Sequence, residues 1–251
     1  MADQHQSSPA ARLVAEGLGS LLLAAAVIGS GVMAERLAAG NTAVALLANT
    51  AATVAVLATL IALLGPISGA HFNPVVSLVQ AMRNAMPWRE AGAFTGVQVV
   101  GCCLGAVLAH AMFELPLIQS SLHVRTGAAQ WLAEGVATFG LILVILGHRR
   151  PEDAPWMVSA WIGAAYWFTA STSFANPAIT IARSLSNTFA GIRPIDVPGF
   201  IAAQLVGALL AVQIAKALFR KSDIRSAEAG PRLVSADKRT DVVSSRTRRR
   251  P

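Results

Sequence analysis

Six long apolar segments, separated by short polar stretches, dominate the pattern of this chain. Each has, or nearly has, the ~20 residues that an α-helix needs to cross a bilayer core. They cover residues 12–34, 42–64, 90–112, 130–148, 155–173 and 197–219. Two shorter apolar pieces, 74–82 and 177–186, follow the second and the fifth segment. The pattern therefore predicts an all-α membrane protein with six transmembrane helices and two re-entrant half-helices.

The composition agrees with this interpretation. Of the 251 residues, 54% are hydrophobic and 13% are charged, whereas soluble domains carry about 25% charged residues. Most of the net charge of +7 lies in residues 220–251, where ten Lys/Arg accompany four Asp/Glu. We expect this segment to be a disordered, solvated cytoplasmic tail rather than a nucleic-acid-binding arm. Residues 1–11 are expected to be a cytoplasmic segment without a cleavable signal peptide.

The two halves of the chain repeat the same motifs in the same order. Ala-Glu-Gly occurs at 15–17 and 133–135, Asn-Pro at 73–74 and 176–177, and Gln-x-Val-Gly at 98–101 and 204–207. Each half contains three long segments, and because three is odd the second half enters the membrane from the opposite side. We therefore expect a channel domain at 12–219 that is an inverted repeat of about 12–112 and 130–219.

Lys and Arg in the short loops predict the orientation in the membrane. Basic residues lie before the first segment, between the second and third, between the fourth and fifth, and after the sixth. They are Arg12, Arg83, Arg89, Arg149, Arg150 and the basic tail. All of these positions share one side, which the positive-inside rule makes cytoplasmic. We expect a multi-pass protein of the inner (plasma) membrane with both termini in the cytoplasm.

Each Asn-Pro pair stands where a short apolar piece begins. Proline fits the first turn of a helix but not its interior, so Asn73-Pro74 and Asn176-Pro177 predict two helix N-termini inside the membrane. Each N-terminus carries about half a positive charge and several free N–H groups. Two such ends at one midplane spot, with the amides of Asn73 and Asn176 facing the lumen, predict a pore that accepts water or hydroxyl compounds and repels cations.

These motifs resemble a known family. The segment 68–75, Ser-Gly-Ala-His-Phe-Asn-Pro-Val, and the triplet Asn176-Pro177-Ala178 look like the paired signature of the aquaporin (major intrinsic protein) family, with Asn73-Pro74-Val75 as the first triplet. The resemblance covers about residues 10–220. It implies the aquaporin fold, a passive channel rather than an enzyme, no cofactor or metal, and a homotetramer with one pore in each subunit.

The resemblance also implies roles for two buried acids. Glu16 and Glu134 match the acidic residues that the family keeps in its first and fourth spans, where they accept hydrogen bonds from the pore-loop backbone. Ionisable groups within a span are costly and are functional by default. We expect them to be structural supports of the loops, with a part in coupled transport as the alternative.

Counting from the two asparagines, as the resemblance implies, gives the narrow selectivity filter. It falls on Thr53, Ala164, Ser173 and Ile179. Water-selective members of the family often have Phe at the first of these positions and His at the second, and nearly all members have Arg at the last. We therefore expect a wide, less polar filter without its fixed cation. A slip of one residue in the fifth segment leaves the large side chains at 166–168 as alternatives.

Two further residues have open roles. His71 matches a pore-side position of the family, or it is a loop-ordering histidine. Arg183 lies four residues beyond Ile179, hence on the same face of the half-helix and one turn farther out. It either lines the outer vestibule or pairs with a loop carbonyl or with Asp196.

The run 176–192 is similar to a bacterial subgroup of the family that is associated with arsenic resistance. We therefore expect a channel for small uncharged solutes: water, glycerol-like polyols, arsenous acid and methylated arsenicals. The alternatives are a strict water channel, a non-conducting membrane scaffold and a coupled transporter. The adjacent Cys102 and Cys103 are expected to be apolar packing residues, and a thiol site for a soft metalloid is the alternative.

Overall fold

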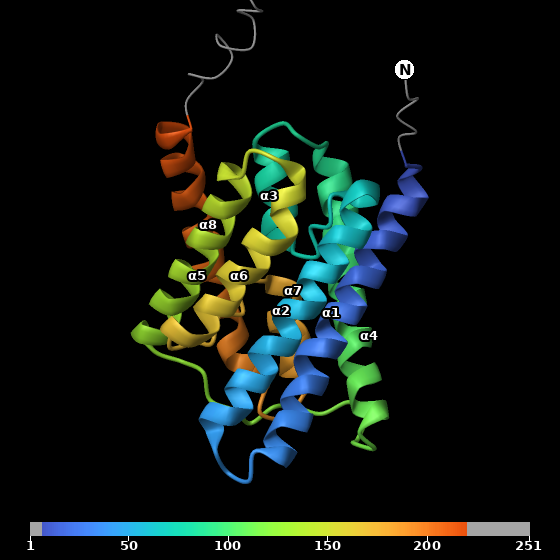
Figure 1. The fold of residues 1–251 in the computed structure, drawn as a ribbon, viewed down its shortest axis with the longest axis vertical. Coiled ribbons are helices and arrows are strands. Elements are labelled where there is room, and N and C mark those ends of the chain that lie inside the picture. Colours follow the sequence, from blue (N-terminus) through green and yellow to red (C-terminus); the bar gives the residue numbers. More distant parts are fainter. Residues whose placement is uncertain (1–6, 220–251) are drawn as a thin grey trace, which may run out of the picture. The chain divides into compact units, whose positions relative to one another are not determined.

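The computed structural model describes residues 7–219, and within them the chain is helical and contains no strand (Figure 1). The long helices are α1 (Pro9–Leu37), α2 (Thr42–Ser68), α4 (Trp88–Met112), α5 (Ala128–Gly147), α6 (Ala154–Phe168) and α8 (Val197–Leu218). The short ones are α3 (Pro74–Met82) and α7 (Pro177–Ser184), and single 3₁₀ turns η1 (Pro151–Asp153) and η2 (Pro194–Asp196) precede α6 and α8. The predicted order of six long helices and two half-helices is confirmed. The predicted tail at 220–251 lies outside the described residues.

Five of the long helices are long and apolar enough to cross a membrane, and α6 is shorter. It has 15 residues and ends at Phe168 rather than at the predicted residue 173. The helix ends there because Thr169, its C-cap, has an extended conformation with φ of -106° and ψ of 138°. Farther along, Thr172 and Ser173 have left-handed φ values of 61° and 50°, which a right-handed helix does not contain. At the other end of the chain, α1 begins at Pro9 instead of residue 12, since the side chain of Ser8 caps it.

The two halves contain the same close helix crossing. In the first half α1 packs against α4, and in the second α5 packs against α8. A Cβ atom on Gly101 of α4 would overlap the carbonyl oxygen of Gly17 in α1, and one on Gly207 of α8 would overlap that of Gly135 in α5. Because only glycine lets two backbones come so close, the repeated glycines build the same helix pair twice.

The half-helices begin near the middle of the bundle and run toward opposite ends. In Figure 1, α3 runs toward the end at which α1 begins and α8 stops, here called the terminal end. The other half-helix, α7, runs toward the opposite end, here called the distal end. The loop 113–127 and the loop 185–193 both lie at the distal end, where backbone hydrogen bonds join Gln119 to Leu185 and Ser121 to Ser184.

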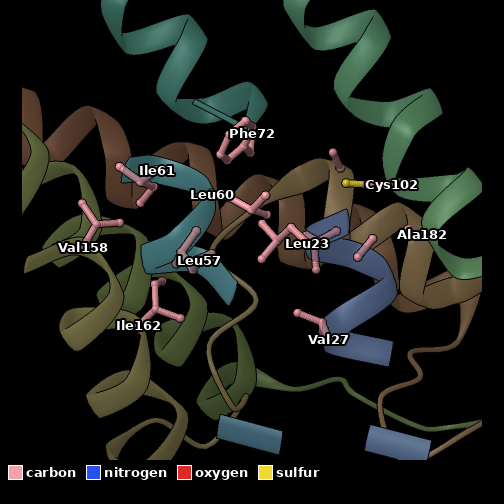
Figure 2. Close-up of a cluster of buried hydrophobic side chains, with 14 of the residues drawn as sticks. Leu23, Val27, Leu57, Leu60, Ile61, Phe72, Cys102, Val158, Ile162 and Ala182 are labelled. Atoms are coloured by element: carbon pink, nitrogen blue, oxygen red, sulfur yellow. The ribbon is translucent and has the colours of Figure 1, made fainter. Parts of the chain in front are cut away.

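An apolar cluster lies beside the half-helix loops and joins α1, α2 and α6. Figure 2 shows Leu23, Leu57 and Ile162 from these three helices together with Phe72 from the loop before α3. All four side chains are buried. Leu23, Leu57 and Ile162 also line the cavity described below, so one face of the core forms an apolar wall of that cavity.

Candidate functional site

A cavity of about 830 Å³ lies between the half-helix loops and the apolar cluster. It extends from His148 and Glu152 near the terminal end to Arg183 at the last turn of α7. Many of the predicted site residues line it: Thr53, His71, Asn73, Ser173, Asn176, Ile179 and Arg183. Others are buried but absent from its lining: Glu16, Pro74, Val75, Glu134, Pro177 and Ala178.

Asn73 and Asn176 cap the two half-helices and bind each other's loops. Each side-chain Oδ1 accepts the backbone N–H two residues later, at 3.0 and 2.9 Å. The Nδ2 of Asn73 donates to the carbonyl of Ala175 at 2.7 Å, and that of Asn176 donates to the carbonyl of Phe72 at 2.8 Å. Each amide carries a second N–H. Two positive helix ends and two amide donors are thus held at one place in the cavity wall.

The residues before each asparagine have left-handed backbone conformations. Ala70 and Phe72 have φ of 49° and 47°, and Ser173 and Ala175 have φ of 50° and 47°. Such conformations cost roughly 1–2 kcal/mol for a residue with a Cβ atom. The pairs occupy equivalent places in the two repeats, so the loops need a specific compensating interaction on both sides of the bundle.

Glu16 supplies that interaction in the first half. Its carboxylate is fully buried and accepts the backbone N–H groups of His71 and Phe72 at 2.9 and 2.8 Å. It also accepts the hydroxyl of Ser68 at 2.6 Å and the amide of Gln98 at 2.8 Å. A buried carboxylate is tolerated when hydrogen bonds of this kind satisfy its oxygens.

Glu134 makes the equivalent bonds in the second half. It accepts the N–H groups of Phe174 and Ala175 at 2.8 and 2.9 Å and the amide of Gln204 at 2.7 Å. Like Glu16, it is fully buried and does not line the cavity. This is the geometry of a loop-supporting carboxylate, and it gives the coupled-transport alternative no support from these two acids.

The distal part of the cavity combines hydroxyl groups with an apolar side chain. The Oγ1 of Thr53 in α2 lies 3.4 Å from the OH of Tyr166 in α6. The Oγ of Ser173 is buried and has no hydrogen-bond partner among the described residues. Ile179 of α7 also lines the wall. A solute at this level therefore meets hydroxyl groups and hydrocarbon, and Ile179 contributes no charge.

The prediction that Ala164 lines the filter is wrong. Its side chain is exposed on the outer face of α6 and is absent from the cavity lining. Tyr166, two residues later, is 3% exposed and lines the cavity instead. The count from Asn176 failed because it crosses the extended loop 169–176, which the sequence pattern had assigned partly to a helix.

Arg183 combines two of the roles predicted for it. Its side chain lines the cavity, and its Nε donates to the loop carbonyl of Ala190. The guanidinium carbon lies 3.4 Å from the ring centroid of Phe174, a cation–π arrangement. It does not pair with Asp196, which forms a salt bridge with Arg193 at 3.0 Å.

A second arginine holds the distal loops together. Arg125 donates from Nε to the carbonyl of Gly191 at 2.8 Å and from Nη1 to that of Ser171 at 3.1 Å. Its backbone N–H donates to Asp196 at 2.9 Å, and its guanidinium lies 5.1 Å from the centroid of Phe174. Burial lowers the pKa of Arg125 to about 10, so it keeps its charge at neutral pH.

His71 and the two cysteines differ in their relation to the cavity. His71 lines it, and its Nδ1 lies 3.0 Å from the Oγ of Ser77, so both predicted roles for this residue have a structural counterpart. Cys102 is fully buried and Cys103 is partly buried, and neither lines the cavity. This favours the packing role of the cysteines over a thiol site. Residues 7–219 contain no His/Cys/Asp/Glu group with metal-binding geometry.

Sequence reasoning missed Phe174 in the distal cavity wall and Arg125 in the loops beside it, and it offered Tyr166 only as an alternative lining residue. Tyr166 did carry a signal, since it is the only tyrosine in the chain and a buried phenol needs a hydrogen-bond partner. Phe174 lies in the motif segment but its ring direction depends on the loop. Arg125 lies in a connecting loop with no motif, so only the fold reveals its contacts.

Comparison with known proteins yields consistent matches. The major intrinsic protein family matches residues 4–169. Aquaglyceroporin AqpS of Rhizobium meliloti is 55% identical over 211 residues, which cover 83% of this chain and 90% of that protein. A probable glycerol uptake facilitator protein of Thermotoga maritima is 27% identical over 169 residues, 61% of this chain and 71% of that protein. The X-ray structure of the aquaglyceroporin from Plasmodium falciparum has the same fold, with a TM-score of 0.64, 18% identity, and coverage of 85% of this chain and 98% of that one.

Proposed function

The chain belongs to the major intrinsic protein family, and we propose that it is a passive channel for small uncharged solutes. It has the aquaporin fold, and it is a multi-pass membrane protein and not an enzyme. The proposed solutes are water, glycerol-like polyols, arsenous acid and methylated arsenicals. The similar proteins named as an aquaglyceroporin and a glycerol uptake facilitator support glycerol among them.

The observation that carries this proposal is the meeting of the two half-helices in the cavity wall. Asn73 and Asn176 stand at helix N-termini that face each other, and each side chain is tied to the opposite loop at 2.7 and 2.8 Å. The positive ends repel cations, while the remaining amide N–H groups are donors to a neutral oxygen. A neutral solute can replace its hydrogen bonds to water with hydrogen bonds to these donors, without a cofactor or an energy source.

The proposal that the channel admits solutes larger than water rests on the distal part of the cavity. Thr53, Ser173 and Ile179 are the proposed filter residues, and Tyr166 takes the place that was predicted for Ala164. Leu57 belongs to the apolar wall described above. A molecule with hydroxyl groups on one side and hydrocarbon, or methylated arsenic, on the other matches such an amphipathic lining.

The outer faces of α2 and α6 support a homotetramer. Small side chains are exposed along both helices, namely Ala48, Ala51 and Ala55 in α2 and Ala160 and Ala164 in α6. Small residues let helices of neighbouring subunits pack closely within a bilayer. We further propose a plasma-membrane location with the terminal end in the cytoplasm, the distal end outside, and residues 220–251 as a basic cytoplasmic tail.

The test is the permeability of proteoliposomes to glycerol and to water in an Ile179→Arg variant. A long cation at the distal cavity wall should cut glycerol re-swelling by about tenfold or more and cut water flux much less, because size exclusion acts first on the larger solute. The matched control is Ile195→Arg, which adds the same charge at a distal position that is 80% exposed and does not line the cavity. Equal loss of water and glycerol flux in Ile179→Arg would mean that Ile179 does not set the bore.

A further inference from the structure

The most unusual group in the cavity wall is the guanidinium of Arg183. The residue is 2% exposed, and within residues 7–219 it has no carboxylate at salt-bridge distance. Its Nε donates to Ala190, whereas the terminal nitrogens donate to no acceptor in the described part of the chain. These two nitrogens are not among the fully enclosed polar atoms that lack a partner, so they have some accessible surface. Because the residue lines the cavity, this surface faces the cavity.

Arg125 provides an internal comparison, since its guanidinium lies near the same Phe174 ring. The centroid of this ring is 5.1 Å from Arg125 and 3.4 Å from Arg183. All three guanidinium nitrogens of Arg125 donate to carbonyls, those of Gly191, Ser171 and Phe189. Each guanidinium nitrogen of Arg125 is therefore held by the distal loops, and Arg125 does not line the cavity. Of these two arginines, it is Arg183 that lines the cavity and, within residues 7–219, keeps both terminal nitrogens free for a solute.

Two buried positive charges near one ring are costly. Removing an ion from water without a partner is strongly unfavourable, and buried arginines are normally paired with carboxylates. Here the described residues give neither guanidinium a carboxylate partner, and hydrogen bonds to carbonyls together with the ring of Phe174 compensate in part. The uncompensated charge acts on anything that passes along the wall. A monovalent cation about 5 Å away, at an effective dielectric constant of about 20, meets a penalty on the order of 100-fold.

We propose that Arg183 is a specificity-determining residue of the outer pore. Its guanidinium excludes small cations and offers hydrogen bonds to the oxygens of neutral solutes, one helical turn farther out than Ile179. Phe174 and the carbonyl of Ala190 hold the guanidinium in the wall, and Arg125 positions the loops that supply both. The assignment rests on the proposed channel function.

The test compares two permeants of the same planar shape, neutral urea and the guanidinium cation. Uptake of each labelled compound is measured in proteoliposomes that contain the full chain. The wild type should favour urea by on the order of 100-fold. In Arg183→Gln or Arg183→Met the guanidinium-to-urea ratio should rise at least ~10-fold, and Arg183→Lys, which keeps the charge, should stay within ~3-fold of the wild type.

The matched control is Arg36→Gln. Arg36 lies at the distal end of α1 in a similar arrangement, with Nη2 donating to Phe113 at 3.0 Å and the guanidinium 5.1 Å from the ring centroid of Phe113. It is exposed and does not line the cavity, so its variant should keep the wild-type ratio.

Three outcomes would overturn the assignment. They are a wild type that takes up guanidinium as fast as urea, a neutral variant with an unchanged ratio, and an Arg183→Lys variant that loses the exclusion. The wild-type and Lys measurements decide the question even where a neutral variant does not fold. Absence of urea and glycerol uptake in the wild type, relative to empty vesicles, would instead refute the channel function itself.

Discussion

Replacing Gly101 by alanine tests how strictly the inverted repeat depends on its close helix crossing. A Cβ at this position would overlap the carbonyl oxygen of Gly17 and lie 3.2 Å from the Cβ of Ser20, so α4 and α1 must move apart. Overpacking of this kind costs about 1–3 kcal/mol. Because α1 also carries Glu16, whose carboxylate holds the loop before α3, the movement should reduce solute flux as well as stability.

The matched control is Gly96→Ala, one and a half turns earlier in the same helix. A Cβ at Gly96 has no neighbour within 4 Å. Both variants gain the same helix propensity, about 1 kcal/mol, so the difference between them isolates the overlap. In thermal unfolding of the detergent-solubilised protein, Gly101→Ala should melt about 2–12 °C below Gly96→Ala. Equal melting temperatures, with equal glycerol flux, would refute the claim that this glycine sets the helix distance.

Two further predictions concern the buried carboxylates. Glu134→Gln should lower the unfolding free energy by roughly 3 kcal/mol and reduce glycerol flux, because an amide cannot accept hydrogen bonds from all three donors that bind Glu134. The control is Glu114→Gln at an exposed position. A Glu134→Gln variant with wild-type flux and wild-type melting temperature would contradict the loop-support role. At Asp196, burial alone raises the pKa, but hydrogen bonds from Arg193 and from the backbone of Arg125 bring it below its ordinary value. The ionised carboxylate therefore stabilises the distal loops fully above about pH 4, and this stabilisation is lost as the pH falls further. The melting temperature, measured as a function of pH, should fall with this transition in the wild type and should not show it in Asp196→Asn.

The sequence predicted the half-helices closely because their signals are local. Asparagine can cap a helix and proline fits only its first turn, so Asn73-Pro74 places the start of α3 at the residue that the structure shows. The end of α6 could not be predicted in the same way. Residues 169–173 are as compatible with a helix as the rest of the segment, yet Thr169 already has an extended conformation. The loop that follows is held by Glu134, which binds the N–H groups of Phe174 and Ala175, 40 and 41 residues away in the sequence.

The distal cavity was harder to predict because its residues come from separate elements. Ile179 could be located by counting within the regular helix α7. The counts to Thr53 and Ala164 both cross an irregular loop, and the count through the longer loop, 169–176, led to the wrong residue. Tyr166 was predicted only as an alternative to Ala164 in the filter. The pairing of Arg183 with the ring of Phe174 requires the three-dimensional path of the loop 169–176, and no spacing rule in the sequence encodes it.

Passive conduction means that this chain lets small neutral solutes pass by diffusion. The most direct measurement is light scattering of proteoliposomes exposed to glycerol, arsenous acid or an impermeant osmolyte, with and without a protonophore. A passive channel with a wide filter should give rapid shrinkage followed by re-swelling with glycerol and arsenous acid, at rates that the protonophore does not change. Water flux alone, without solute entry, would contradict the proposed wide filter, and re-swelling that stops when the proton gradient collapses would contradict passive conduction.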